Sequence, residues 1–167
     1  AAVGAGERAG QAERGVGGAS DACEDSGGEV LGLDGGSPVR YPPGEHSTLG
    51  HKRRGIGVVI APWNCPLAMP TGMVAAALVT GNAVIFKPSE DTPATAAAFV
   101  RVFADAGLPP GVFNIVLGAG DTGDALVSHP DVRVISFTGS TETGLKVYQR
   151  AAGMGKKVSL EMGGKNA

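Results

Sequence analysis

Residues 56–86, IGVVIAPWNCPLAMPTGMVAAALVTGNAVIF, decide the fold. The run Ile56–Ala61 is short and continuously apolar, which is typical of a strand buried on both faces of a sheet. Small residues then predict a helix over Leu67–Val79, which the pair Gly81-Asn82 ends, and Ala83–Phe86 predicts a second buried strand. Two apolar strands separated by a helix at this spacing indicate a right-handed βαβ unit with parallel strands.

The same alternation continues toward the carboxyl terminus. Thr92 and Pro93 predict an N-cap and a first helical position, and the helix that they open extends to Ala106. Its buried face is expected to hold Phe99, Val102, Phe103 and Ala106. Further strands are expected over Val112–Leu117, Val132–Phe137 and Val158–Leu160, and further helices over Asp121–Ser128 and Ser140–Ala152. The sequence therefore predicts an α/β fold, a Rossmann-like doubly wound and mostly parallel sheet.

The amino-terminal quarter has a different composition. Residues 1–40 are rich in Gly, Ala, Asp and Glu and contain no aromatic residue, which predicts a poorly ordered or atypical segment. Residues 41–167 are expected to form a partial dinucleotide-binding domain. The sequence has no initiator methionine and stops shortly after the pair Gly163-Gly164, so we expect a piece of a longer protein.

Composition and charge exclude several classes of partner. The net charge of −2 gives no basic footprint for nucleic acid or an anionic membrane. No apolar run approaches the roughly 20 residues of a membrane span, and the first residues lack the apolar core of a secretory signal. Cys23, Cys65 and the three histidines have neither disulfide nor metal-ligand spacing. We expect a cytoplasmic protein without metal, nucleic-acid or membrane partners.

Two glycine-containing turns are candidate phosphate sites. Gly118, Gly120 and Gly123 form a G-x-G-x-x-G that follows a strand and opens a helix, the context of a dinucleotide fingerprint. The acidic residue expected about 20 positions later is missing, so a tight turn that needs glycine remains the alternative. Gly139 and Ser140 open the next helix, whose N–H groups and dipole favour an anion; an ordinary serine N-cap is the alternative.

Polar residues at other strand ends are candidates for chemistry. Lys87 and Glu90 follow a parallel strand, where ligands of open α/β sheets bind, although a solvated ion pair is the alternative. The side-chain amide of Asn64 suits an oxyanion donor, and ordinary turn chemistry is its alternative. Glu161 lies where a strand runs into the glycine pair, which suits the presentation of a carboxylate to a cleft. Cys65 is either a nucleophile or a small buried hydrophobe.

The order of four motifs is more specific than any one of them. Pro62-Trp63-Asn64, Lys87-Pro88-Ser89-Glu90, Phe137-Thr138-Gly139-Ser140 and Glu161-Met162-Gly163-Gly164-Lys165 together resemble the aldehyde dehydrogenase superfamily, over about residues 41–167. Within it, Met162 and the runs at 135–140 and 147–152 are similar to those of 1-pyrroline-5-carboxylate (glutamate γ-semialdehyde) dehydrogenases.

The resemblance implies a mechanism and a set of site residues. It implies oxidation of a small-molecule aldehyde to a carboxylate through a cysteine thiohemiacetal and thioester, with Asn64 sharing the oxyanion and Glu161 as general base. NAD is the implied cofactor, because Glu90 would repel the 2′-phosphate of NADP. The candidate cofactor-binding residues are Ile60, Ala61, Pro62, Trp63, Lys87, Ser89, Glu90, Gly120, Gly139 and Ser140.

The departures from the family limit what this chain is expected to do alone. No cysteine follows Glu161, and Cys65 stands where the family usually has an aromatic residue, so the 167-residue chain is expected to be inactive alone. The full-length protein is expected to be a homo-oligomer that oxidises L-glutamate γ-semialdehyde to L-glutamate. The alternatives are another semialdehyde, such as succinate semialdehyde, and a non-catalytic dinucleotide-binding module.

Overall fold

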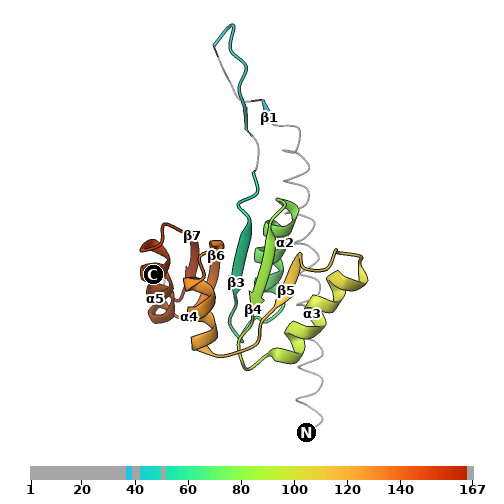
Figure 1. Cartoon of the computed structure of the whole chain (residues 1–167), viewed down its shortest axis with the longest axis vertical. Coiled ribbons are helices and arrows are strands. Elements are labelled where there is room, and N and C mark those ends of the chain that lie inside the picture. The colour runs from blue at the N-terminus through green and yellow to red at the C-terminus, as the bar shows by residue number, and fades with distance from the viewer. Residues whose placement is uncertain (1–36, 39–41, 50–51, 165–167) are drawn as a thin grey trace.

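A computed structural model describes residues 37–38, 42–49 and 52–164. The disorder predicted for residues 1–40 lies outside the described residues, apart from the short strand β1 (Ser37–Pro38). This strand pairs in antiparallel fashion with β2 (Thr48–Leu49), and the two form an arm beyond the main sheet (Figure 1). Lys165, the last residue of the fourth motif, also lies outside the described residues.

The main sheet has five strands in the order β5-β4-β3-β6-β7, and every neighbouring pair is parallel. The strands are β3 (Ile56–Ile60), β4 (Ala83–Lys87), β5 (Phe113–Ile115), β6 (Val132–Gly139) and β7 (Lys157–Met162). The helices that connect them are α2 (Ala68–Val79), α3 (Pro93–Asp105), α4 (Gly120–Ser128) and α5 (Thr141–Ala152). The predicted α/β fold with a doubly wound parallel sheet is confirmed.

Helices cover both faces of the sheet, so the central strand is buried on both sides. Val59 of β3 belongs to a core cluster with residues of α2 and α3, whereas Val58 belongs to a second cluster with residues of α4 and α5. Successive side chains of a strand point to opposite faces, which explains why neighbouring valines join different clusters. The chain first winds from β3 outward to β5 and then returns to the other side of β3 as β6 (Figure 1).

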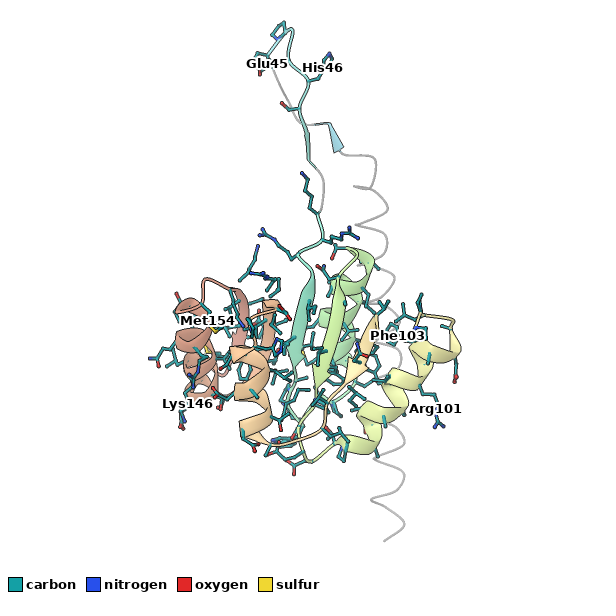
Figure 2. The ribbon with its side chains drawn as sticks, viewed as in Figure 1. Glu45, His46, Arg101, Phe103, Lys146 and Met154 are labelled. Carbon is teal, nitrogen blue, oxygen red and sulfur yellow. The ribbon has the colours of Figure 1, made fainter. Side chains whose placement is uncertain are left out.

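The buried face of α3 is narrower than the sequence predicts. Phe99 is buried and Phe103 is half-buried, and the two rings meet edge-to-face with centroids 5.2 Å apart. Val102 and Ala106 are exposed, so their predicted burial is wrong. Figure 2 shows Phe103 and Arg101 on α3, and the Phe103 ring also lies 5.0 Å from that of Phe113. With Phe103 aimed at the sheet, Val102 lies about 100° around the helix and faces solvent.

Two strand lengths differ from expectation because pairing partners decide them. β5 is shorter than the expected Val112–Leu117. The next bond of its ladder with β4 would need a backbone N–H from Pro88, and proline has no N–H to donate. β7 is longer than Val158–Leu160 because β6 offers partners as far as Gly139, which faces Met162. Glu161 therefore lies inside a paired strand, opposite Thr138.

Candidate active site

The carboxyl ends of all five parallel strands meet at one edge of the sheet. There, the ends of β3, β6 and β7 surround a pocket of about 410 Å³. Its lining comprises Pro62, Trp63, Asn64, Met69, Thr138, Gly139, Ser140, Glu161, Met162 and Gly163. Because β3 and β6 are neighbours but are separated in the chain by β4 and β5, this is the topological switch point where open α/β sheets bind ligands.

The two predicted catalytic residues line this same pocket. Asn64 follows β3 in a turn bounded by Pro62 and Pro66, and Glu161 lies near the end of β7. Both are exposed, and in the described part of the chain neither side chain has a hydrogen bond or ion pair with another residue. An amide donor and a carboxylate are therefore free to act on a ligand held between them.

The segment that carries Glu161 is fixed to the start of α5. Thr141 Oγ1 donates a hydrogen bond of 3.0 Å to the backbone oxygen of Gly163. The Met162 side chain lies over Gly144, where an added Cβ would approach Met162 Sδ to 2.5 Å. Thr141 and Gly144 are supporting residues that the sequence reasoning missed. For Gly144, the signal that could have indicated it is a glycine placed four residues after the Ser140 N-cap, inside α5.

Ser140 is confirmed as the N-cap of α5. Its Oγ accepts a hydrogen bond of 3.2 Å from the Thr143 N–H, and its backbone oxygen accepts one of 2.9 Å from the Gly144 N–H. The first N–H groups of a helix have no partner within the helix, and Ser140, which directly precedes them, lines the pocket beside Gly139. The capping alternative and the anion-binding interpretation are therefore compatible, with backbone N–H groups as the donors to an anion.

Lys87 and Glu90 lie at the end of β4, beside this pocket but not in its lining. Lys87 is 6% exposed, so the alternative of a solvated pair is wrong for the lysine. Its Nζ lies 3.4 Å from Oε2 of Glu90, which is itself exposed. A hydrogen bond from its own backbone, followed by the charge and hydrogen bond of Lys87, lowers the pKa of the Glu90 carboxyl. The Glu90 carboxylate is therefore held charged at the ligand-binding edge.

Most of the remaining candidate residues have side chains that are buried in the core or hydrogen-bonded within their own turn. Ala61 is buried in the core cluster beside α2, and Ile60 is half-buried against the opposite cluster. Their side chains therefore point into the core. Ser89 Oγ is engaged in its own turn, where it accepts a hydrogen bond of 3.3 Å from the Asp91 N–H. Trp63 is 63% exposed at the pocket.

The glycine triplet at 118–123 is explained by a tight turn. Gly118 has φ +155°, and a Cβ there would collide with the Thr122 side chain. Gly120 opens α4 and Gly123 is buried within it, and neither lines the pocket with Asn64. The turn alternative accounts for Gly118, while a cofactor role for Gly120 stays a prediction.

The described residues offer no support for a Cys65 nucleophile, a metal site or a membrane span. Cys65 is half-buried and does not line the pocket. Among residues 37–38, 42–49 and 52–164, no group of His, Cys, Asp and Glu is placed to hold a metal ion. Within the same ranges, none of the helices combines the length and apolar character needed to span a bilayer.

Comparisons with known proteins identify the family and the fold of this chain. Residues 2–167 match the aldehyde dehydrogenase family. The chain is 46% identical over 155 residues to 1-pyrroline-5-carboxylate dehydrogenase of Bacillus cereus, an alignment covering 89% of this chain and 30% of that protein. A lactaldehyde dehydrogenase structure superposes with a TM-score of 0.82 and 38% identity, over 93% of this chain and 33% of that one. Betaine aldehyde dehydrogenase from Staphylococcus aureus, solved with NAD+, gives a TM-score of 0.75 and 36% identity, over 84% of this chain and 28% of that one.

Proposed function

Since this chain belongs to the aldehyde dehydrogenase family, we propose that it supplies the cofactor cleft, the oxyanion donor and the general base for NAD-dependent oxidation of an aldehyde to a carboxylate. One observation carries the proposal: Asn64, Ser140 and Glu161 come from the ends of different elements and line one pocket. The chain covers 30% of the length of its Bacillus cereus relative. The activity is therefore proposed for the complete protein.

The two catalytic residues act at successive steps. A cysteine sulfur attacks the aldehyde carbon to form a thiohemiacetal, and the Asn64 amide donates to the oxygen on which negative charge develops. Loss of a hydride from the thiohemiacetal carbon to the oxidised cofactor would leave a thioester. Glu161 then accepts a proton from the water that hydrolyses the thioester to the carboxylate and releases the cysteine thiol. The sequence has no cysteine after Cys65, so the proposal assigns the sulfur to protein beyond these 167 residues.

The residues at the neighbouring strand ends fit NAD. An ammonium has three donors, and buried Lys87 has one carboxylate partner at 3.4 Å, which leaves donors for ribose hydroxyls. The N-terminus of α5 suits the pyrophosphate. When bound, NAD supplies a hydride acceptor. Glu90 is charged because its pKa is lowered, so it accepts hydrogen bonds from ribose hydroxyls and repels a 2′-phosphate, which favours NAD over NADP.

The proposed substrate is L-glutamate γ-semialdehyde, with L-glutamate as the product. Support comes from the name of the Bacillus cereus relative and from Met162, which lines the pocket next to Glu161. Another semialdehyde is the competing proposal, and a substrate panel on the complete protein separates the two. We expect that complete protein to be a homo-oligomer.

Cofactor binding is testable on the 167-residue chain. Trp63 is the single tryptophan and lines the pocket, so its fluorescence should report added NAD. We expect NAD to bind more tightly than NADP, Lys87→Met to weaken NAD binding at least tenfold, and Glu90→Gln to narrow the preference. Lys146→Met is the control. It removes an exposed ammonium of α5 outside the pocket and should leave the binding of NAD and NADP unchanged. Equal binding of NAD and NADP by the unmutated chain would contradict the cofactor assignment.

The role of Glu161 needs a nucleophile and is testable in a chimera with the parts of the Bacillus cereus relative that this chain does not cover. Glu161→Gln should keep a single burst of NADH, up to about one per active site, and lose steady turnover because the thioester is no longer hydrolysed. Asn64→Ala should lower the burst rate itself by about 10²–10³-fold. Normal turnover by the Glu161→Gln chimera would contradict the general-base role of Glu161.

A further inference from the structure

A second groove lies on the face of the sheet that carries α2 and α3. These helices pack mainly on β3, β4 and β5. In the described part of the chain, α2 reaches β6 at Thr138, whose Oγ1 lies 3.7 Å from Met73 Sδ, but no helix packs extensively on β6 or β7 on this face. The groove there has a volume of about 920 Å³. Its lining includes the cations Lys52, Arg53, Arg54 and Lys157 and the hydroxyls of Ser136 and Ser159, but no acidic residue.

These cations lie at the end of the sheet opposite the active-site pocket. Residues 52–54 precede β3, and Lys157 begins β7. The ion pairs found among the described residues include none of the four. Arg133 of β6 adds a further positive charge, since its Cγ is 3.9 Å from a Cβ placed on Gly55. Like charges gathered without a counter-charge repel one another, so the groove favours an anionic occupant.

The basic run is held in place by one side chain. Asn82 Oδ1 accepts hydrogen bonds from the backbone N–H groups of Arg54, at 2.6 Å, and Gly55, at 3.1 Å. Its Nδ2 donates to the backbone oxygen of Ala77 at 3.0 Å. The backbone of the run is therefore tied to the end of α2, which fixes where the cations emerge.

The chain itself contains a matching anionic segment. Residues 21–34, DACEDSGGEVLGLD, carry five carboxylates and no Lys or Arg. In the β1–β2 pair, Ser37 lies opposite Leu49. Lys52 follows Leu49 by three residues, so the start of β1 is held close in the chain to the basic run. Asp34 is likewise three residues from Ser37, and three residues reach at most about 10 Å. Short tethers keep the local concentration of the segment high.

We propose that residues 21–34 dock on the groove between α2 and the exposed face of β6 and β7, with their carboxylates paired to Lys52, Arg53, Arg54 and Lys157. Single exposed ion pairs are weak, so the interaction depends on several charges acting together and on the tether. It is therefore sensitive to salt. It is independent of the proposed catalytic function, because the groove lies at the opposite end of the sheet.

Zero-length carbodiimide cross-linking of the 167-residue chain tests the proposal, because it joins a carboxylate to an amine only where they touch. We expect peptides that link residues 21–34 to Lys52 or Lys157, and their yield should fall severalfold at high salt. Lys157→Gln should remove the cross-links between residues 21–34 and position 157, and it should leave the cross-links to Lys52. Exposed Lys146 on α5 is the matched control and should link to Glu142, 2.7 Å away, and not to the segment.

Isotope mixing identifies the occupant. In an equal mixture of 14N- and 15N-labelled chains, linked peptides should carry one label. Mixed-label links would show a second copy in the groove and would overturn the proposal. So would links from residues 21–34 to Lys146 as frequent as those to Lys52 and Lys157. Docking of residues 21–34 should also protect Lys52 and Lys157 of the unmutated chain from acetylation. Replacing Asp21, Glu24 and Asp25 by amides should abolish this protection. Unchanged protection would also contradict it.

Discussion

At the residue scale, the side chain of Asn82 joins two parts of the sheet domain. It accepts from two backbone N–H groups of the chain entering β3 and donates to Ala77 O and Thr80 Oγ1 at the end of α2. Asn82→Ala leaves these groups unpaired and should lower the free energy of unfolding by about 2–3 kcal/mol, measured in urea. Asn114→Ala removes a single exposed bond of 2.8 Å to Gly111 O and is the control, with a loss of about 1 kcal/mol or less. Equal losses would contradict the bridging role.

Glu90 gives the chain a pH-dependent contribution to stability. Because folding lowers the Glu90 pKa below its ordinary value of 4.5, the folded state favours the ionised carboxylate. This contribution is present above pH 4.5 and is lost as the pH falls through the lowered pKa. Glu90→Gln should therefore be less stable than the unmutated chain near neutral pH, and the gap should close in acid. Urea unfolding across this range measures it.

The sequence predicted the residues that project from strand ends better than the residues that support them. Asn64, Ser140 and Glu161 follow recognisable apolar runs, and all three line the predicted cleft. The burial of Lys87 and the support from Thr141 were not predictable. Both depend on contacts between elements that are distant in the chain, and these leave no local pattern.

At the element scale, the packing of α5 on the end of β7 depends on Gly144. Alanine in a helix interior normally stabilises by about 0.5–1 kcal/mol relative to glycine. At Gly144 the added Cβ would instead lie 2.5 Å from Met162 Sδ, 2.8 Å from Met162 Cγ and 3.2 Å from Phe137 Cε1. We therefore expect Gly144→Ala to destabilise by about 1–3 kcal/mol, measured by thermal or urea unfolding.

The matched control is Gly123→Ala in α4, where a Cβ meets nothing within 4 Å and should stabilise the chain. Truncating the obstacle should restore much of the loss, so Gly144→Ala combined with Met162→Ala should be less destabilised than the sum of the two changes. Additive effects would show that Met162 is not what Gly144 accommodates.

Element boundaries were predicted less well than element identities. Every predicted strand and helix of the main sheet domain is present, but β5 ends early at the lack of an N–H in Pro88, and β7 continues while β6 pairs with it. Val102 fits an apolar stripe in sequence and is 65% exposed, because Phe103 takes the place facing the sheet. The spacing of apolar residues in the sequence therefore predicts that a strand or helix exists, whereas pairing and packing with other elements decide where it ends.

At the scale of the whole molecule, the strand order determines the site. Local patterns predict alternating strands and helices, but they do not show that the chain returns past β3 to place β6 beside it. That return is what sets Asn64 next to Ser140 and Glu161. The motif order implied this arrangement only through family resemblance, since no pairing signal is local in sequence.

In the described part of the chain, the two core clusters lie on opposite faces of the sheet, and β3 contributes to both. Val58 is 1% exposed in the cluster beside α4 and α5, and Val59 is 2% exposed in the cluster beside α2 and α3. If the sheet makes both clusters one cooperative unit, Val58→Ala and Val59→Ala should each lower the stability of a single transition by about 2 kcal/mol. Far-ultraviolet circular dichroism and Trp63 fluorescence in urea should then give coincident curves for both variants. Val102→Ala, on the exposed side of α3, should change the midpoint little. Separate midpoints for the two probes in either variant would mean that the faces unfold independently, and that β3 alone does not couple them.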